Sequence, residues 1–139
     1  MTRVYVDMVA DIFHYGHVAF LEKARAFGDH LLVGVCSDET ARANKRIPIL
    51  NMGERVESVA GCRHVDEVLP DAPWVIDLAW IKQHQIDLVV HGDDYSQEQI
   101  DSYYGVPLSM GIFRTVAYTP TISTTEIIRR CKEFNPARD

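Results

Sequence analysis

The sequence has few cysteines, no long apolar run and no surplus of positive charge. The three cysteines, Cys36, Cys62 and Cys131, are odd in number and lack metal-ligand spacing, so we expect free thiols. No apolar run approaches the roughly 20 residues that span a bilayer, and the N-terminus has no signal-peptide pattern. The net charge of −6 argues against a nucleic-acid partner, which needs a broad basic face. We therefore expect a cytoplasmic protein without membrane or nucleic-acid partners, in which a local basic cluster meets any anionic ligand.

The chain of 139 residues, 47% of them hydrophobic, is expected to form a single domain over residues 1–139. Short β-rich runs alternate with amphipathic stretches. The runs that predict strands are Val4–Asp7, Leu31–Val35, Val65–Leu69, Ile86–His91 and Phe113–Tyr118. The expected helices are Val18–Phe27, capped by Gly28, a short one opening at Ser37, Met52–Cys62, Trp74–His84, Gln97–Tyr104 and Ser123–Lys132. This alternation predicts an α/β fold, a Rossmann-like open and mostly parallel five-stranded sheet with helices on both faces.

Ligands of such sheets bind outside the carboxyl ends of the strands. His14, Asp94 and the loop 119–125 each follow an expected strand. We therefore expect them to meet at one rim, although they lie far apart along the chain.

Two histidines stand at the start of the first expected helix, in the segment His14-Tyr15-Gly16-His17. Side chains three residues apart lie on the same face of a helix, and the free N–H groups of the helix N-terminus favour anions. Gly16 is expected to let a phosphate approach the backbone closely, because it has no β-carbon. The segment favours a polyphosphate site, and the alternative is a pair of surface histidines at a helix start.

A second helix start carries three hydroxyl side chains, in the segment Ile122-Ser123-Thr124-Thr125-Glu126. Ser123 with Glu126 three residues later has the pattern of a capping box. Hydroxyls and free amides at a second helix N-terminus would complete a triphosphate cradle. A helix cap without a ligand is the structural alternative.

Together these segments resemble a known family. An apolar run followed by His-x-Gly-His resembles the signature of the nucleotidyltransferase superfamily. Ile122–Thr125 resembles the Ile-Ser-Thr-Thr motif of its cytidylyltransferases, and Val90-His91-Gly92-Asp93-Asp94 resembles their Gly-Asp-Asp segment. With Val-Asp-Glu-Val at 65 to 68, the resemblance extends over nearly the whole chain.

The resemblance implies Mg²⁺-assisted attack by a phosphate oxygen of a small acceptor on the α-phosphorus of CTP, with release of pyrophosphate. It implies catalytic roles for His14, His17 and Lys45, whereas no protein nucleophile is needed. Mg²⁺ is expected to be held mainly by the CTP phosphates, so no protein metal ligand is named. The implied nucleotide-binding residues are Val9, Ala10, Asp11, Gly16, Arg46, Arg55, Arg63, Gly92, Asp94, Tyr118, Thr119, Ile122, Ser123, Thr124 and Thr125.

Several of these residues have structural alternatives. Lys45 and Arg46 are also consistent with a solvated loop tip, and Arg55 and Arg63 with surface ion pairs. Asp11 could orient a backbone turn as readily as contact a ligand. Asp94, which can only accept hydrogen bonds when ionised, would suit a base that carries an amino group.

The acceptor stays open between two classes. The first strand and His14–His17 are similar to phosphoethanolamine and phosphocholine enzymes, which carry Arg-Thr-Glu/Gln-Gly before Ile-Ser-Thr-Thr. Here the corresponding residues are Tyr118-Thr119-Pro120-Thr121, so an arginine is missing. This loop and Met8-Val9-Ala10-Asp11 look more like phosphonate cytidylyltransferase domains, and both differ from the glycerol 3-phosphate enzymes. A cationic acceptor would suit carboxylate or aromatic neighbours. The candidates are Asp77 and four aromatic residues that would otherwise fill the core or an interface, Trp74, Trp80, Tyr103 and Tyr104.

Two further hypotheses come from other classes. His-x-Gly-His also serves ATP-using adenylyltransferases, although Asp94 and the Ile122–Thr125 segment argue against ATP. The missing arginine is compatible with a nucleotide sensor that has no catalytic activity. The family resemblance also implies a homodimer.

Overall fold

One open sheet of five parallel strands organises the chain, in the order β3-β2-β1-β4-β5. In the computed structural model, which describes residues 1–137, the strands are β1 (Arg3–Met8), β2 (His30–Val35), β3 (Glu67–Pro70), β4 (Leu88–Gly92) and β5 (Phe113–Val116). β1 lies at the centre because Val4, Tyr5 and Val6 are fully buried. The predicted Rossmann-like sheet is confirmed, and all of its strands are parallel.

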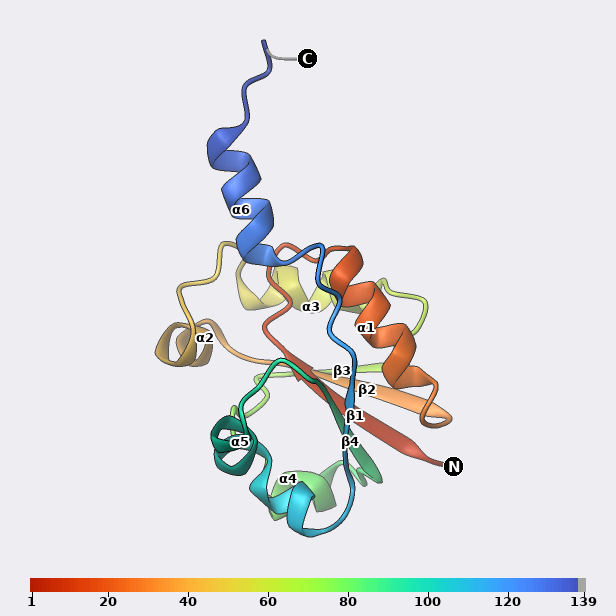
Figure 1. Cartoon of the computed structure of the whole chain (residues 1–139). Coiled ribbons are helices and arrows are strands. Elements are labelled where there is room, and N and C mark those ends of the chain that lie inside the picture. Colours follow the sequence, from red (N-terminus) through yellow and green to blue (C-terminus); the bar gives the residue numbers. More distant parts are fainter. Residues whose placement is uncertain (138–139) are drawn as a thin grey trace.

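Helices cover both faces of the sheet, as predicted (Figure 1). Helices α1 (Tyr15–Arg25) and α3 (Met52–Ala60) pack on one face, against a cluster that includes Val4 and Val6. Helices α4 (Leu78–Gln83) and α5 (Gln97–Ser109) lie on the other face, which Tyr5 enters. Alternate residues of β1 therefore contribute to opposite cores, as the pleat of a strand requires.

Three strands are shorter than predicted. β4 runs from Leu88 to Gly92 rather than from Ile86 to His91. β3 starts at Glu67 and not at Val65, because the Asp66 carboxylate accepts a hydrogen bond from the N–H of Leu31 at 2.8 Å just before the ladder begins. β5 ends at Val116, and the carbonyl of Ala117 accepts from Lys23 Nζ at 3.0 Å in place of a strand partner.

The first helix differs from its prediction at both ends. It begins at Tyr15, because His14 caps it, and it ends at Arg25 with Ala26 as the C-cap residue in right-handed conformation. The prediction that Gly28 caps this helix is therefore wrong. Gly28 instead allows a close approach, since a β-carbon there would lie 2.7 Å from the carbonyl oxygen of Thr2.

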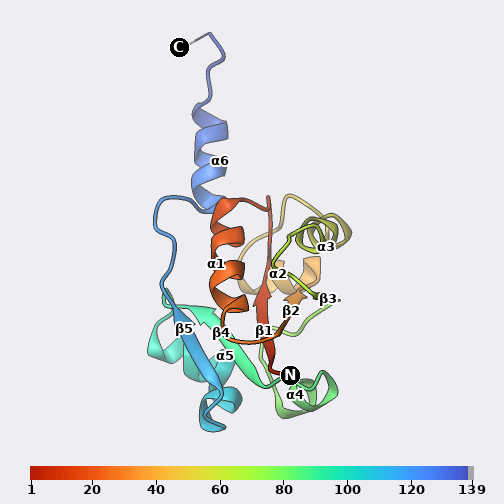
Figure 2. The ribbon, with the colours of Figure 1, turned by 90° about the vertical axis from the view of Figure 1, so that its right-hand side faces the viewer.

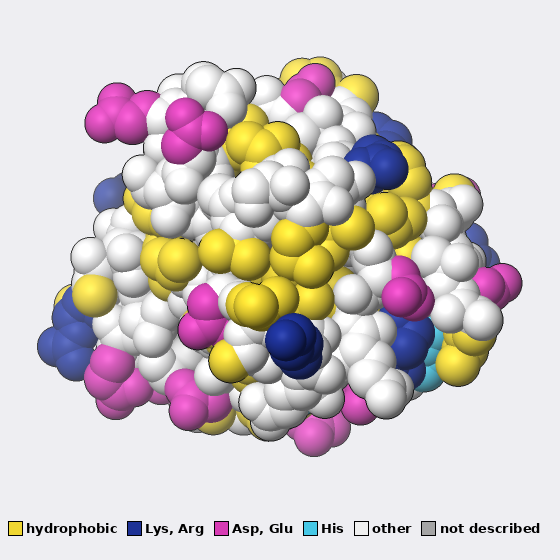
Figure 3. Space-filling view, turned by 90° about the horizontal axis from the view of Figure 1, so that it is seen from below, with side chains coloured by type: hydrophobic (Ala, Val, Ile, Leu, Met, Phe, Trp, Pro, Cys, Tyr) yellow, Lys and Arg dark blue, Asp and Glu magenta, His cyan; other side chains and the backbone are white. Residues whose placement is uncertain are grey.

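The two helices of the opposite face also differ from prediction. α4 starts only at Leu78, since Asp77 Oδ1 accepts from the N–H of Trp80 at 2.8 Å and acts as the N-cap. α5 continues to Ser109 through a kink at Tyr104, whose φ and ψ of −125° and 19° are not helical. Figure 3 shows hydrophobic surface on the side seen from below, and exposed apolar residues of this part of the chain are Val75, Leu78, Leu108 and Met110.

The remaining helices are α2 (Asp38–Asn44) and α6 (Thr124–Glu133). α6 projects away from the sheet (Figures 1 and 2), and none of its residues is buried. Among residues 1–137, no helix has both the length and the apolar character needed to cross a membrane.

Candidate active site

A cavity of about 480 Å³ lies at the carboxyl ends of the strands, where the sequence predicts the ligand site. It is bordered by the ends of β1 and β4, by the first turns of α1 and α6, and by the loop after α2. All but two of the predicted site residues line it: Val9, Ala10, Asp11, His14, Gly16, His17, Lys45, Arg46, Gly92, Asp94, Tyr118, Thr119, Ile122, Ser123, Thr124 and Thr125.

The two histidines form a reciprocal cap at the N-terminus of α1. His14 Nδ1 accepts from the N–H of Gly16 at 3.0 Å, and His17 Nδ1 accepts from the N–H of His14 at 3.1 Å. Because both Nδ1 atoms accept, this hydrogen-bond network places the proton of each neutral ring on Nε2. Burial lowers the pKa of His14, and burial together with the charges of His14 and Lys45 lowers the pKa of His17 to about 3. Both imidazoles are therefore neutral donors near pH 7.

Gly16 lines the cavity, and its lack of a side chain also has a local structural reason. A β-carbon at this position would lie 2.8 Å from His14 Cε1 and 3.2 Å from Ile122 Cγ2. Glycine therefore lets the His14 imidazole and Ile122 approach the helix start closely, and the predicted approach of a phosphate stays a prediction.

Asp11 fixes the loop between α2 and α3 against the β1–α1 connection. Its carboxylate accepts from the N–H groups of Ile49 and Leu50 at 2.8 and 2.9 Å, and from Arg46 Nη1 at 3.1 Å. Burial alone would raise the pKa of Asp11, but these donors outweigh it, so the pKa is lowered. The same connection contains two residues with positive φ, Ala10 at 59° and Ile12 at 48°. Asp11 therefore stabilises a backbone conformation that L-residues rarely adopt.

Arg55 and Arg63 are the two predicted site residues that do not line the cavity. Arg55 is fully buried and donates to the carbonyls of Leu50 and Val9 at 3.0 and 2.8 Å and to Asp38 Oδ1 at 2.7 Å. Arg63 borders a groove elsewhere on the surface. Neither arginine is therefore placed to contact a ligand in this cavity. The prediction failed because spacing along a helix does not reveal which face of the helix meets the cavity.

The start of α6 reaches the cavity through its hydroxyls. Ser123 Oγ accepts from the N–H of Glu126 at 3.0 Å, so the predicted cap is present. The reciprocal half of the box is not, because the Glu126 carboxylate binds Arg129 and Arg130 of its own helix. Thr124 Oγ1 donates to the carbonyl of Asp11 at 2.9 Å and lies 3.4 Å from His14 Nε2.

The opposite end of the cavity is acidic and aromatic. Asp7 accepts from the hydroxyl of Tyr104 at 2.5 Å, and burial raises the pKa of its carboxyl group. The ring of His91 stacks on Tyr95 with centroids 4.2 Å apart. Asp7, His91 and Tyr95 are not among the residues that the sequence predicts for the site. A signal exists for two of them, since Asp7 and His91 are polar residues near the ends of apolar strands.

Three of the five candidates for a cationic acceptor line this end, namely Trp74, Tyr103 and Tyr104. The other two do not. Trp80 packs in the core with its ring centroid 6.1 Å from that of Tyr5, and Asp77 caps α4.

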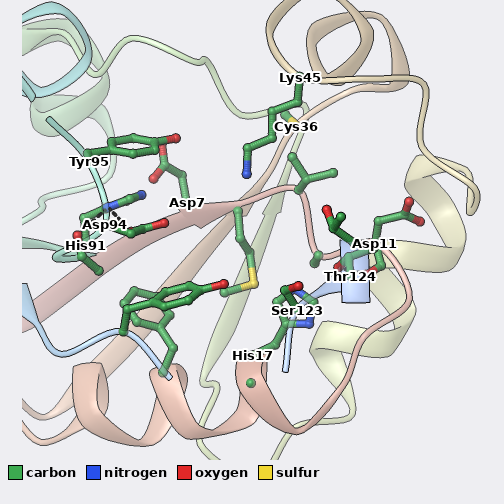
Figure 4. A pocket seen from close by; sticks show the side chains of 18 of the residues that line it. Asp7, Asp11, His17, Cys36, Lys45, His91, Asp94, Tyr95, Ser123 and Thr124 are labelled. Carbon is green, nitrogen blue, oxygen red and sulfur yellow. Dashed lines mark hydrogen bonds and ion pairs between the residues drawn. The ribbon is translucent and has the colours of Figure 1, made fainter. Parts of the chain in front are cut away.

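Figure 4 shows the division of the cavity. Asp7, His91, Asp94 and Tyr95 lie on one side, and Asp11, His17, Ser123 and Thr124 lie on the other, with the Lys45 side chain extending between them. Lys45 and Arg46 are the Lys and Arg side chains that line the cavity within the described part of the chain.

The chain is thus a parallel α/β domain that carries two helix N-termini and a pair of imidazole donors at the carboxyl edge of its sheet. Residues 8–130 match the model of the Cytidylyltransferase-like family, and the chain belongs to that family.

Named relatives and a solved structure agree with this membership. The chain is 46% identical to an ethanolamine-phosphate cytidylyltransferase of Arabidopsis thaliana, over 91% of this chain and 32% of that protein. It is 40% identical to human choline-phosphate cytidylyltransferase A, over 92% of this chain and 36% of that protein. The chain thus spans about a third of these relatives. The crystal structure of a lipopolysaccharide core biosynthesis protein from Thermoplasma volcanium superimposes with a TM-score of 0.68 and 27% identity, covering 86% of this chain and 97% of that one.

Proposed function

We propose that this protein transfers CMP from CTP to a small phosphorylated alcohol of the phosphoethanolamine or phosphocholine kind, with release of pyrophosphate. The observation that carries the proposal is the division of one cavity into a donor-rich end and an acidic, aromatic end, with Lys45 between them. The named relatives are ethanolamine-phosphate and choline-phosphate cytidylyltransferases, which supports the same reaction.

The reaction requires positioning and charge neutralisation. A phosphate oxygen of the acceptor forms a bond to the α-phosphorus of CTP, and the bond from that phosphorus to the bridging oxygen of pyrophosphate breaks. Negative charge grows on the equatorial and leaving oxygens, where the Nε2–H groups of His14 and His17 would donate. The Lys45 ammonium would draw the two phosphates together. The acceptor brings its own nucleophile, so no side chain needs to form a covalent bond.

Mg²⁺ fits this proposal as an ion carried by the triphosphate. Asp11 has its oxygens engaged by Ile49, Leu50 and Arg46, and no group of three or more His, Cys, Asp or Glu side chains among residues 1–137 is placed to hold a metal. The donors would then be mainly phosphate oxygens and water. When bound, the ion would offset phosphate charge beyond what Lys45 and Arg46 supply.

The acceptor end favours a cation. A carboxylate at Asp7 and the rings of Trp74, Tyr95, Tyr103 and Tyr104 suit an ammonium group, through charge and through cation–π contact. A phosphonate acceptor is the second candidate, because Tyr118 and Thr119, whose segment resembles the phosphonate enzymes, line the cavity. Asp94, which the sequence assigns to the amino-bearing base of CTP, lies on this side of the cavity in Figure 4, so its contact with the base stays a prediction.

Two further expectations belong to the proposal. A homodimer is proposed on the family resemblance, and light scattering on the purified protein would test it by giving twice the chain mass. The cytoplasmic location expected from the sequence stays a prediction.

The experiment that tests the function is pyrophosphate release from CTP and Mg²⁺ against phosphoethanolamine, phosphocholine, glycerol 3-phosphate, 2-aminoethylphosphonate and 2-hydroxyethylphosphonate, with ATP in parallel. We expect turnover with CTP and a cationic phosphoalcohol. Turnover with only a phosphonate would show that the acceptor is a phosphonate and not a phosphorylated alcohol. Turnover with ATP alone, or CTP binding without turnover on any acceptor, would contradict the proposal in favour of an adenylyltransferase or a nucleotide sensor.

A further inference from the structure

We infer that Phe13 is a positioning residue for the proposed reaction, because its ring fixes the plane of the His17 imidazole so that Nε2 faces the cavity. The inference rests on the proposed function. Phe13 itself does not line the cavity, so it would act only through His17.

The geometry around His17 carries the inference. The Phe13 and His17 rings are parallel to within 4°, with centroids 5.3 Å apart. The His14 ring lies 4.0 Å away at 37°, and the His14 N–H donates to His17 Nδ1. That single hydrogen bond leaves the imidazole free to tilt about its direction. The parallel Phe13 ring limits this tilt.

The backbone before the helix shows how Phe13 reaches this position. Ala10 and Ile12 have positive φ, and Asp11 between them is anchored by the Ile49 and Leu50 N–H groups. The chain therefore folds sharply after β1. Phe13 then lies half-buried, packed against the core cluster beneath α1 and placed against His17. The fold thus fixes one face of the ring in the core and offers the other to the imidazole.

Because the Phe13 ring stacks on one face of the His17 imidazole, it should keep water from that face. The charged groups that act on this imidazole are His14 and Lys45, which disfavour its protonation, and Asp11, which favours it. None of these is removed by a change at Phe13. A variant that loses the ring should therefore alter the solvation and tilt of His17 while its charged neighbours stay in place.

The test compares Phe13→Leu, Phe13→Tyr and a matched core variant, Val56→Ala, which removes packing from the same cluster on α3. The readouts are kcat and KM with the best acceptor, and the pKa of each histidine from ¹⁵N-imidazole NMR of the ligand-free protein. We expect Phe13→Leu to lower kcat about 10- to 100-fold with KM for CTP changed less than about threefold, as for a misplaced donor. The pKa of His17 should rise in Phe13→Leu. In Phe13→Tyr, which keeps the ring, kcat and the His17 pKa should both stay near their wild-type values.

Other outcomes decide against the inference. An unchanged His17 pKa and kcat in a folded Phe13→Leu protein would overturn it, as would equal effects of Val56→Ala. Should Phe13→Leu fail to fold, Phe13→Met, closer in volume, takes its place. Because the NMR titration needs no acceptor, it still tests Phe13 if the proposed reaction fails.

Discussion

His17 Nδ1 accepts a hydrogen bond from the backbone N–H of His14 at 3.1 Å, and the same first turn of α1 is capped by the His14 side chain. The groups that cap the helix are thus the groups that face the cavity. Each imidazole uses Nδ1 to cap the helix, which leaves Nε2 of His17 for a ligand, whereas Nε2 of His14 lies 3.4 Å from Thr124 Oγ1. This division explains why the two histidines can be neutral and still act as donors.

Replacing either histidine by alanine is expected to lower kcat about 10²- to 10⁴-fold, the range for loss of a donor to transition-state charge. Steady-state kinetics with CTP and the best acceptor would measure it. His30→Ala, at the N-terminal end of β2, is the control for loss of an imidazole, since His30 does not line the cavity. Equal rates for His17→Ala and the control would show that the site is misidentified.

The pH dependence of stability follows from His17. Its folded pKa of about 3 is below the unfolded value of about 6.5, so the unfolded chain binds more protons between these values. The free energy of unfolding should therefore fall on acidification from pH 7 to 5, by about 2 kcal/mol from this residue. Urea unfolding at both pH values, compared with His17→Asn, would measure the difference. A variant with the same pH slope as the wild type would refute the depressed pKa.

Asp7→Asn tests the acceptor end. The amide keeps an oxygen that can accept from Tyr104 but loses the charge that would meet an ammonium group. KM for a cationic acceptor is expected to rise about 10- to 100-fold, the range for a charged hydrogen bond, while the Kd for CTP stays near its wild-type value. Calorimetry with CTP and kinetics with the acceptor separate the two effects. An unchanged acceptor KM would argue for an uncharged head group.

Asp11→Asn is expected to lower the free energy of unfolding by about 1–3 kcal/mol, because one carboxylate satisfies two backbone N–H groups and Arg46 in a buried place. Asp29→Asn is a matched control, as Asp29 accepts from the single exposed N–H of Thr2. Denaturant unfolding of both variants provides the comparison. A similar loss of unfolding free energy in the two variants would mean that the hydrogen bonds of Asp11 to the loop contribute little to stability.

Arg55→Met tests whether Arg55, which is buried and does not line the cavity, has a structural role. The change leaves the Val9 and Leu50 carbonyls without their donor, and each buried carbonyl that is left unsatisfied costs about 1–3 kcal/mol. We expect a large fall in urea midpoint. A stable variant with weakened CTP binding would instead support the predicted role of Arg55 in nucleotide binding.

The sequence by itself determined the α/β sheet, the order of its elements and the two helix starts that border the cavity. These features are local, because apolar periodicity, a Ser or His before a helix and polar residues after strands all act over a few positions. The parallel sheet then brings the segments His14–His17 and Ile122–Thr125 to one rim, which the alternation of strands and helices is sufficient to predict.

The tertiary structure alone decided which side chains share the cavity. Arg55 points into the core and Asp77 caps α4, whereas Asp7, His91 and Tyr95 meet around the acceptor end. Nor does sequence spacing reveal that Phe13 stacks on His17, or that His14 fills the room beside Gly16. These relationships depend on the direction of a side chain and on backbone angles such as those of Ala10 and Ile12, which packing of the whole chain fixes.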